Sequence, residues 1–185
     1  MHARILCKLY GALFALIMLL SLRAIAGDTI GVTVSGIVQY KNTSNTPVAG
    51  VRIIFAGFDT VTGPDGRYSF FSVAPGKYLL GGMKTGNAAG INALDALIVM
   101  RYFLGLMPLD SLNRLAADVT NNDLVNAADA WFIVHHIVTD PALAFPRGDW
   151  VFLPQIVIIR DSNVTVNLPA LCVGDVDGSF VPHEP

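Results

Sequence analysis

Cysteine and glutamate are nearly absent from this chain of 185 residues. One of the two cysteines, Cys7, lies in a segment that we expect to be removed, so Cys172 is left alone and no internal disulfide can form. Glu184 is the only glutamate, and the His-Glu-x-x-His signature of zinc hydrolases does not occur.

Motifs of other enzyme classes are also missing. The sequence has no nucleophile elbow with a Ser/His/Asp order and no glycine-rich loop that would bind phosphate. Asp175 and Asp177 are two residues apart on a turn, whereas the two carboxylates of a glycosidase face each other across a sugar cleft. Because the basic residues form no stripe, nucleic acid is not an expected partner. We therefore predict that the chain is not an enzyme.

The first 26 residues are typical of a secretory signal peptide. A basic start is followed by an apolar run over residues 9–20 and by Ala24-Ile25-Ala26. The run is about twelve residues long, short of the roughly 20 that cross a bilayer, so we expect no stable membrane insertion after cleavage behind Ala26. Loss of Arg4, Lys8 and Arg23 changes the net charge from −2 to −5. The predicted location is extracellular or at the cell surface.

Residues 27–83 alternate short β-rich runs with turn residues such as Gly63-Pro64-Asp65-Gly66. This alternation predicts an antiparallel β-sandwich. The expected strands cover residues 32–40, 51–55, 68–71 and 77–80.

The order SGIVQY, TPVAGVRIIF and TVTGPDGRYSFFSVAPGKYLL in this segment resembles the carboxypeptidase-regulatory-like and collagen-adhesin B-type repeats. The resemblance implies a prealbumin-like sandwich that serves as a rigid spacer or adhesive scaffold, with carbohydrate binding in some members. Some relatives carry a Lys–Asn isopeptide bond assisted by a buried acidic residue, commonly Glu. That bond is not expected here, because Glu184 lies far outside the segment.

Beyond Met83 the apolar period changes from two to about 3.6 residues, which predicts helices. Ile91-Asn92-Ala93-Leu94-Asp95-Ala96 aligns with Val125-Asn126-Ala127-Ala128-Asp129-Ala130 at a constant offset of 34 residues. Residues 84–140 therefore contain an internal duplication. Each copy continues into an apolar helix, over residues 97–104 in the first copy and 131–138 in the second.

The second copy contains a complete set of oxygen donors for a calcium loop. Such a loop places ligands at positions 1, 3, 5, 7, 9 and 12, with a backbone carbonyl at the seventh. Counting from residue 118 gives Asp118, Thr120, Asn122, the Leu124 carbonyl, Asn126 and Asp129. The alternative is a loop of solvated carboxylates in which Asp129 only caps the following helix.

An Asn at position 9 and an Asp at position 12, directly before an apolar helix, resemble the dockerin type I repeat. The resemblance implies a secreted, calcium-dependent module of two repeats, with Asp118 and Asp129 as charged ligands. Such modules are best known for attaching polysaccharide-degrading enzymes to cohesin partners. Two residues depart from the pattern, because Asp123 stands where Gly is usual and Thr120 where Asn or Asp is commoner.

The first copy keeps only half of a loop. Counting back from Asp95 leaves Asn92 and Asp95 as donors, because lysine, glycine and alanine hold positions 1, 3 and 5. The missing half occurs near the C-terminus as Asp175, Asp177 and Ser179. We predict that the C-terminal segment folds back and forms a split calcium site from these five residues. The alternative is an Asp/Gly-rich turn without metal.

The β signal returns over residues 150–160 and 164–168, on either side of the turn Asp161-Ser162-Asn163. Residues 141–185 are therefore expected to form a β-hairpin followed by a Gly-Asp-Val-Asp-Gly-Ser segment. The predicted fold is α+β: a prealbumin-like antiparallel β-sandwich, a two-helix dockerin-like module that binds Ca²⁺, and a C-terminal β-hairpin. The whole pattern is similar to C-terminal regions of large secreted proteins from Bacteroidetes-type bacteria.

Two functions fit this organisation. In the first, the chain is a secreted dockerin-like interaction module in an assembly that handles polysaccharide. Calcium then orders Ala93, Leu94, Ala127 and Ala128 for a cohesin-like or other cell-surface protein, with a polysaccharide as a second candidate partner. In the second, the chain is a calcium-stabilised spacer or a carbohydrate-binding-like adhesive module without a cohesin-type partner. Apolar residues at these helix starts fit both functions.

Overall fold

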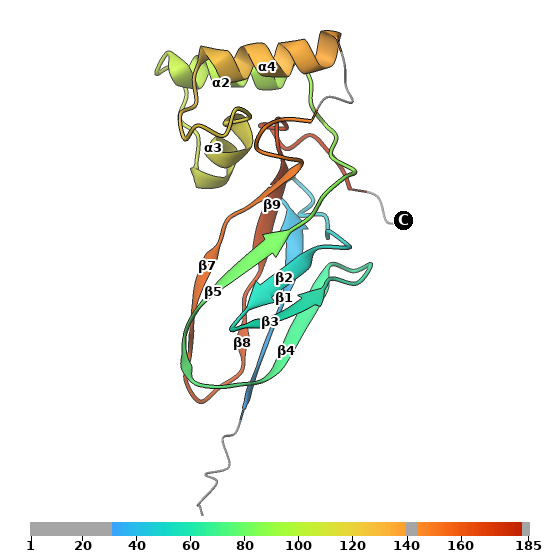
Figure 1. The fold of residues 1–185 in the computed structure, drawn as a ribbon, viewed down its shortest axis with the longest axis vertical. Coiled ribbons are helices and arrows are strands. Elements are labelled where there is room, and N and C mark those ends of the chain that lie inside the picture. Colours follow the sequence, from blue (N-terminus) through green and yellow to red (C-terminus); the bar gives the residue numbers. More distant parts are fainter. Residues whose placement is uncertain (1–30, 140–143, 183–185) are drawn as a thin grey trace, which may run out of the picture. The chain divides into compact units, whose positions relative to one another are not determined.

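The structure is a computed structural model in which residues 31–139 and 144–182 are described. The predicted signal peptide over residues 1–26 lies outside the described residues. Two β-sheets and three helices occupy the described ranges, so the α+β content that the sequence predicts is confirmed (Figure 1). No helix in these ranges is both long and apolar enough to cross a bilayer.

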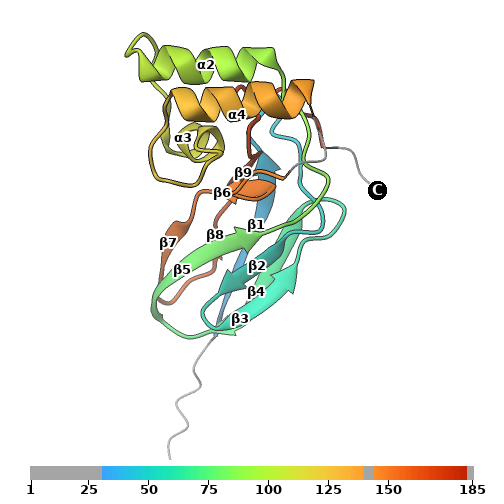
Figure 2. The same ribbon diagram turned by 45° about the horizontal axis from the view of Figure 1, so that its top comes forward.

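The first sheet is built around β1 (Val32–Tyr40), whose side chains alternate between buried and half-buried. The strand order is β4-β1-β9-β6, and the short β8 also pairs with β1. β4 (Arg67–Val73) runs antiparallel to β1, whereas β8 (Val164–Thr165) and β9 (Leu168–Cys172) run parallel to it. β6 (Trp150–Phe152) completes the sheet antiparallel to β9 (Figure 2).

The second sheet is antiparallel throughout and has the order β3-β2-β5-β7. Its members are β2 (Arg52–Phe55), β3 (Phe58–Val61), β5 (Gly76–Met83) and β7 (Gln155–Ile159). β3 is not among the predicted strands. The two residues that join it to β2, Ala56 and Gly57, both have positive φ, and alanine is a weak signal for such a turn.

One buried core joins the two sheets to the helices. Between the sheets, the rings of Phe55 and Phe70 lie 5.5 Å apart. An added Cβ on Gly82 of β5 would lie 2.8 Å from the ring of Phe152, so this close approach of β5 to the first sheet requires glycine. Full burial of a large apolar side chain stabilises a fold by about 1.5–3 kcal/mol, so this shared core resists separation of its parts.

The helical region follows β5 and contains one helix more than the sequence predicts. α2 (Ala93–Phe103) and α4 (Ala127–Val138) lie side by side, and α3 (Ser111–Ala117) contacts β6 and β9 (Figures 1 and 2). α3 has only seven residues, too few for a clear apolar period. It forms because the Asp110 side chain caps its first turn and because Leu112 is buried in the core.

The predicted C-terminal hairpin is wrong. β7 pairs with β5 in the second sheet, whereas β8 and β9 pair with β1 in the first. The turn at Asp161-Ser162-Asn163 therefore carries the chain from one sheet to the other. Asn163 accepts a hydrogen bond from the Thr33 amide at 2.8 Å, so this turn also supplies a partner to β1. Backbone N–H and C=O groups at a strand edge need hydrogen-bond partners, and the returning chain supplies them to β1 and β5.

Candidate calcium sites

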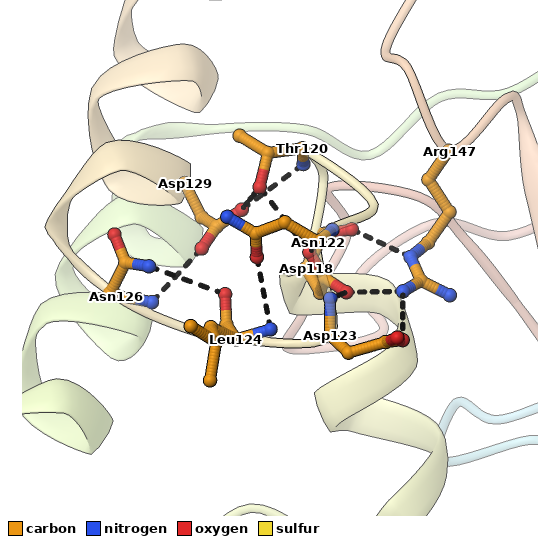
Figure 3. A network of polar contacts seen from close by, with 8 residues as sticks. All are labelled: Asp118, Thr120, Asn122, Asp123, Leu124, Asn126, Asp129 and Arg147. Atoms are coloured by element: carbon orange, nitrogen blue, oxygen red, sulfur yellow. Dashed lines mark hydrogen bonds and ion pairs between the residues drawn. The ribbon is translucent and has the colours of Figure 1, made fainter.

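The loop between α3 and α4 links all six predicted donors of the second copy into one hydrogen-bonded network (Figure 3). The hydroxyl of Thr120 joins the two carboxylates, because it lies 2.8 Å from Asp129 Oδ1 and 3.3 Å from Asp118 Oδ1. The other donors are joined by bonds from the Leu124 amide to the Asn122 side chain, from the Asn126 side chain to the Leu124 carbonyl, and from the Asn126 amide to Asp129.

The two carboxylates of this loop are buried and held by backbone amides. Asp118 is 2% exposed and Asp129 is fully buried. The amides of Asn122 and Asp123 donate to the two oxygens of Asp118 at 3.1 and 2.9 Å. Asp123 has a φ of 63°, and Asp tolerates this left-handed conformation better than most residues. The sharp turn at this loop position, where Gly is usual, therefore forms with Asp123.

Helix capping, the alternative role for this loop, is also present. Asn126 is the N-cap of α4, and its side chain accepts a hydrogen bond from the Ala128 amide at 2.8 Å. Asp129 completes a capping box by accepting from the Asn126 amide. Capping uses one oxygen of Asp129, and the other faces Thr120, so the geometry is compatible with a cation as well as with a cap.

The structure brings the five residues of the predicted split site together. One carboxylate oxygen from each of Asp95, Asp175 and Asp177 lies within 4.8 Å of the other two. Asp95 Oδ1 accepts from the amides of Val176 and Asp177 at 2.7 and 3.0 Å, which ties the first helix to the C-terminal segment. The Asn92 and Ser179 side chains are 3.3 Å apart.

The C-terminal half of this cluster has the hydrogen-bond pattern of the intact loop. Asp175 accepts from the amides four and five residues later, those of Ser179 and Phe180, each at 3.0 Å. Asp118 accepts in the same way from the amides four and five residues after it. Residues 175–180 therefore take the place that residues 118–123 have in the intact loop.

The half from the first copy matches in the same way. Asp95 accepts from the Asp177 amide, just as Asp129 accepts from the Thr120 amide. The Gly90 carbonyl accepts a hydrogen bond from the Asn92 side chain at 2.9 Å, as the Leu124 carbonyl accepts one from the Asn126 side chain. Gly90 thus stands at the carbonyl position of the loop. It was not among the predicted donors, although the 34-residue offset from Leu124 points to it.

The pKa shifts of Asp95 and Asp175 in the split cluster are opposite in direction to that of Asp118 in the intact loop. Burial, with smaller contributions from Asp177 and Asp175, raises the pKa of Asp95 from 3.8 to about 6. Burial also raises the pKa of Asp175. At Asp118 burial acts in the same direction, but hydrogen bonds from the Asn122 amide and the Arg147 guanidinium outweigh it and lower the pKa. Burial thus penalises the ionised forms of Asp95 and Asp175, and a bound cation would offset that penalty.

These shifts predict that the protein in calcium-depleted buffer becomes more stable as the pH falls from 7 to 5. The folded chain holds a proton on Asp95 more tightly than the unfolded chain does, because the folded pKa is about 6 and the ordinary value is 3.8. Stability from this group is complete below the unfolded pKa and is lost as the pH rises through 6, so the expected gain is about 1 kcal/mol. Urea unfolding at both pH values measures it.

Asp95→Asn is the control for this prediction, because it removes this titrating group and should reduce the gain in stability between pH 7 and 5. If the metal-free wild-type chain loses stability as the pH falls from 7 to 5, Asp95 is not a buried carboxylate with a raised pKa.

Two further residues contact the carboxylates and were missed by sequence reasoning. Arg147 forms an ion pair with Asp118, and its Nε donates to the Asp118 carbonyl at 2.6 Å. The hydroxyl of Tyr40, at the end of β1, donates to Asp175. Both come from segments far from the loops in sequence, so no local spacing could have indicated them.

The four residues predicted to face a partner are all exposed. Ala93 and Leu94 begin α2, and Ala127 and Ala128 begin α4. Next to them lie the half-exposed apolar side chains of Leu97 and Trp131, which occupy equivalent positions in the two copies. The same 34-residue offset would have identified this second pair.

Comparison with known families supports the resemblance of the duplicated region to dockerins. The family model of the dockerin type I domain matches residues 89–138, which span both helix starts and the loop from Asp118 to Asp129. This region is therefore similar to a class of non-catalytic, calcium-binding modules for protein–protein interaction. No curated protein matches the chain.

Proposed function

We propose that this chain is a secreted, non-catalytic calcium-binding module that attaches to another protein in an extracellular or cell-surface assembly. The observation that carries the proposal is the loop from Asp118 to Asp129, whose donors form one network inside the region that matches the dockerin type I domain. Dockerin domains bind cohesins, so a cohesin-like protein is the proposed partner. We also propose that the assembly handles polysaccharide. Polysaccharide is the second proposed ligand of the chain.

Two calcium ions are part of this proposal. The first would be held by Asp118, Thr120, Asn122, the Leu124 carbonyl, Asn126 and Asp129. The second would be held by Asn92, Asp95, Asp175, Asp177 and Ser179, with the Gly90 carbonyl at the seventh loop position. Calcium prefers six to eight oxygen ligands, and every group in both sets carries oxygen. Bound calcium would neutralise carboxylates that are costly to bury without a counter-charge.

Exposure of the helix faces favours an interaction module over a spacer. A spacer whose apolar helix faces docked onto its own sheets would bury Leu94, Leu97 and Trp131. These side chains are instead 49%, 50% and 57% exposed. Apolar side chains, aromatic ones above all, are enriched at the buried centre of protein interfaces, and here they lie near both helix starts.

Replacing Leu94 by Asp should weaken capture of a protein partner at least tenfold, because it places a charge at the centre of the proposed interface. The measurement is capture by the immobilised protein from cell-surface and culture fractions of the source organism, followed by a binding titration with the purified partner. Phe71→Asp is the matched control, because Phe71 is 71% exposed but lies on β4. Capture should require calcium and should persist in the control variant.

Binding that survives both a chelator and Leu94→Asp would contradict the interaction proposal. Binding of a polysaccharide that needs neither calcium nor Leu94 would instead favour the adhesive β-sandwich function, and the repeats would then be a calcium-stabilised spacer.

A further inference from the structure

The first aspartate of each candidate calcium site has a different outer partner. In the intact loop, Asp118 Oδ2 accepts from the guanidinium of Arg147, which also donates from Nε to the Asp118 carbonyl at 2.6 Å (Figure 3). In the split site, Asp175 Oδ2 accepts from the hydroxyl of Tyr40. The backbone amides four and five residues later donate to both aspartates in the same way, whereas these side-chain partners differ.

The ion pair of Arg147 is shielded from solvent. The side chains of Arg147 and Asp118 are 12% and 3% exposed, and the guanidinium also lies 3.7 Å from Asp123 Oδ1. Charges at such a site are screened weakly by salt. Arg147 therefore cancels part of the negative charge that a cation at the loop would need.

The split site has more negative charge and no such partner. It has three carboxylates, on Asp95, Asp175 and Asp177, against two at the predicted ligand positions of the intact loop. None of the ion pairs within the described ranges involves these three residues. Tyr40, the partner that corresponds to Arg147, is a neutral hydrogen-bond donor.

We infer that Arg147 lowers the calcium affinity of the loop from Asp118 to Asp129, so that the split site binds calcium first. The inference rests on the proposed function, because it assumes that both sites bind calcium. The charge count of the ligands is one of the two factors that set the affinity of calcium loops, together with rigidity. The site that looks incomplete in the sequence is then the tighter of the two.

Arg147 has a second consequence in the absence of calcium. As a built-in counter-ion, it allows the intact loop to stay folded around Asp118 without a metal. The described residues supply no counter-ion to the split site, so its three carboxylates repel one another until calcium or protons arrive. Loss of calcium should therefore affect the C-terminal segment before it affects the intact loop.

A calcium titration of the purified protein, followed by amide NMR signals, tests the order of binding. The amides of Ser179 and Phe180 report the split site, because they donate to Asp175. The amides of Asn122 and Asp123 report the intact loop. We expect the first pair to respond at roughly tenfold lower free calcium than the second, the scale on which ligand charge tunes such loops.

Substitution of Arg147 tests whether its positive charge is what lowers the calcium affinity of the intact loop. Arg147→Gln should tighten calcium binding at the intact loop by roughly tenfold, because it removes the opposing charge. Arg147→Lys should leave the affinity low, since it keeps that charge. Arg114→Gln is the matched control: Arg114 lines the same hollow as Arg147 and Asp118, but it forms no ion pair with Asp118. Melting curves of the calcium-loaded variants would show that each one folds.

The outcomes separate this inference from the proposed function. If the amides of Asn122 and Asp123 never respond to calcium, the loop is not a calcium site and the proposed function fails. If both sites bind calcium but the loop fills first, or if Arg147→Gln weakens the loop or leaves its affinity unchanged, the proposed function stands and the inference is overturned. Weakening would mean that Arg147 holds Asp118 in its binding orientation.

Discussion

Chelating calcium should lower the melting temperature of this protein by roughly 10 °C or more. A ligand that binds only the folded chain stabilises it by about 4 kcal/mol per site when its free concentration is a thousand times Kd. For a chain of this size, about 1 kcal/mol corresponds to a shift of roughly 2–4 °C. Differential scanning calorimetry with and without a chelator measures the shift.

Magnesium provides the control for this result. Magnesium demands octahedral geometry and gives up its water reluctantly, so adding it to the chelated protein should restore little of the lost stability. An unchanged melting temperature after chelation would show that the oxygen clusters are capped turns without metal. Full recovery with magnesium would show a general cation effect at an acidic surface.

Asp177→Asn should weaken calcium binding at the split site and leave the affinity of the intact loop unchanged. Asp177 is exposed and its amide is held by Asp95, so the substitution removes one charge with little disturbance of the core. The affinity of the split site should fall at least roughly tenfold, because one of three carboxylates is lost. Isothermal titration calorimetry would then show that the tighter of the two wild-type binding steps is weakened while the other is unchanged.

Asp161→Asn is the matched control, because Asp161 is an exposed aspartate on the turn between β7 and β8. It should leave both affinities unchanged. Equal behaviour of the two variants would show that Asp177 is not a ligand. A point substitution is a sharper test than truncation after Leu171, since truncation also removes Cys172, Val173 and Val176 from the buried core.

The intact loop and the duplication could be predicted from the sequence because both depend on local spacing. Loop positions 1 to 12 lie within twelve residues, and the chain between Asp118 and Asp129 has little freedom to place them otherwise. The approach of the C-terminal aspartates to Asp95 was also predictable, since the donors missing from the first copy are present near the C-terminus in the right order. The structure brings Asp95 and Asp177 together by a direct hydrogen bond.

The strand partners could not be predicted from the sequence. The runs after residue 150 have the alternation of a hairpin, and nothing local shows that β1 and β5 offer them better edges. Parallel pairing of β9 with β1 depends on contacts between residues about 130 positions apart, such as Val38 with Leu168. Tyr40 is 135 residues from Asp175 and Arg147 is 29 residues from Asp118, so these contacts follow from the completed fold rather than from any local motif.

A direct count of bound calcium tests the central claim, that the chain holds two calcium sites of matching geometry. Equilibrium dialysis of the purified protein against calcium, with atomic emission to measure the metal, gives the number of ions per chain. We predict two, with the affinities separated by about tenfold because the split site has one carboxylate more and Arg147 opposes calcium at the intact loop. One ion per chain would contradict the split site, and none would contradict the account of both loops.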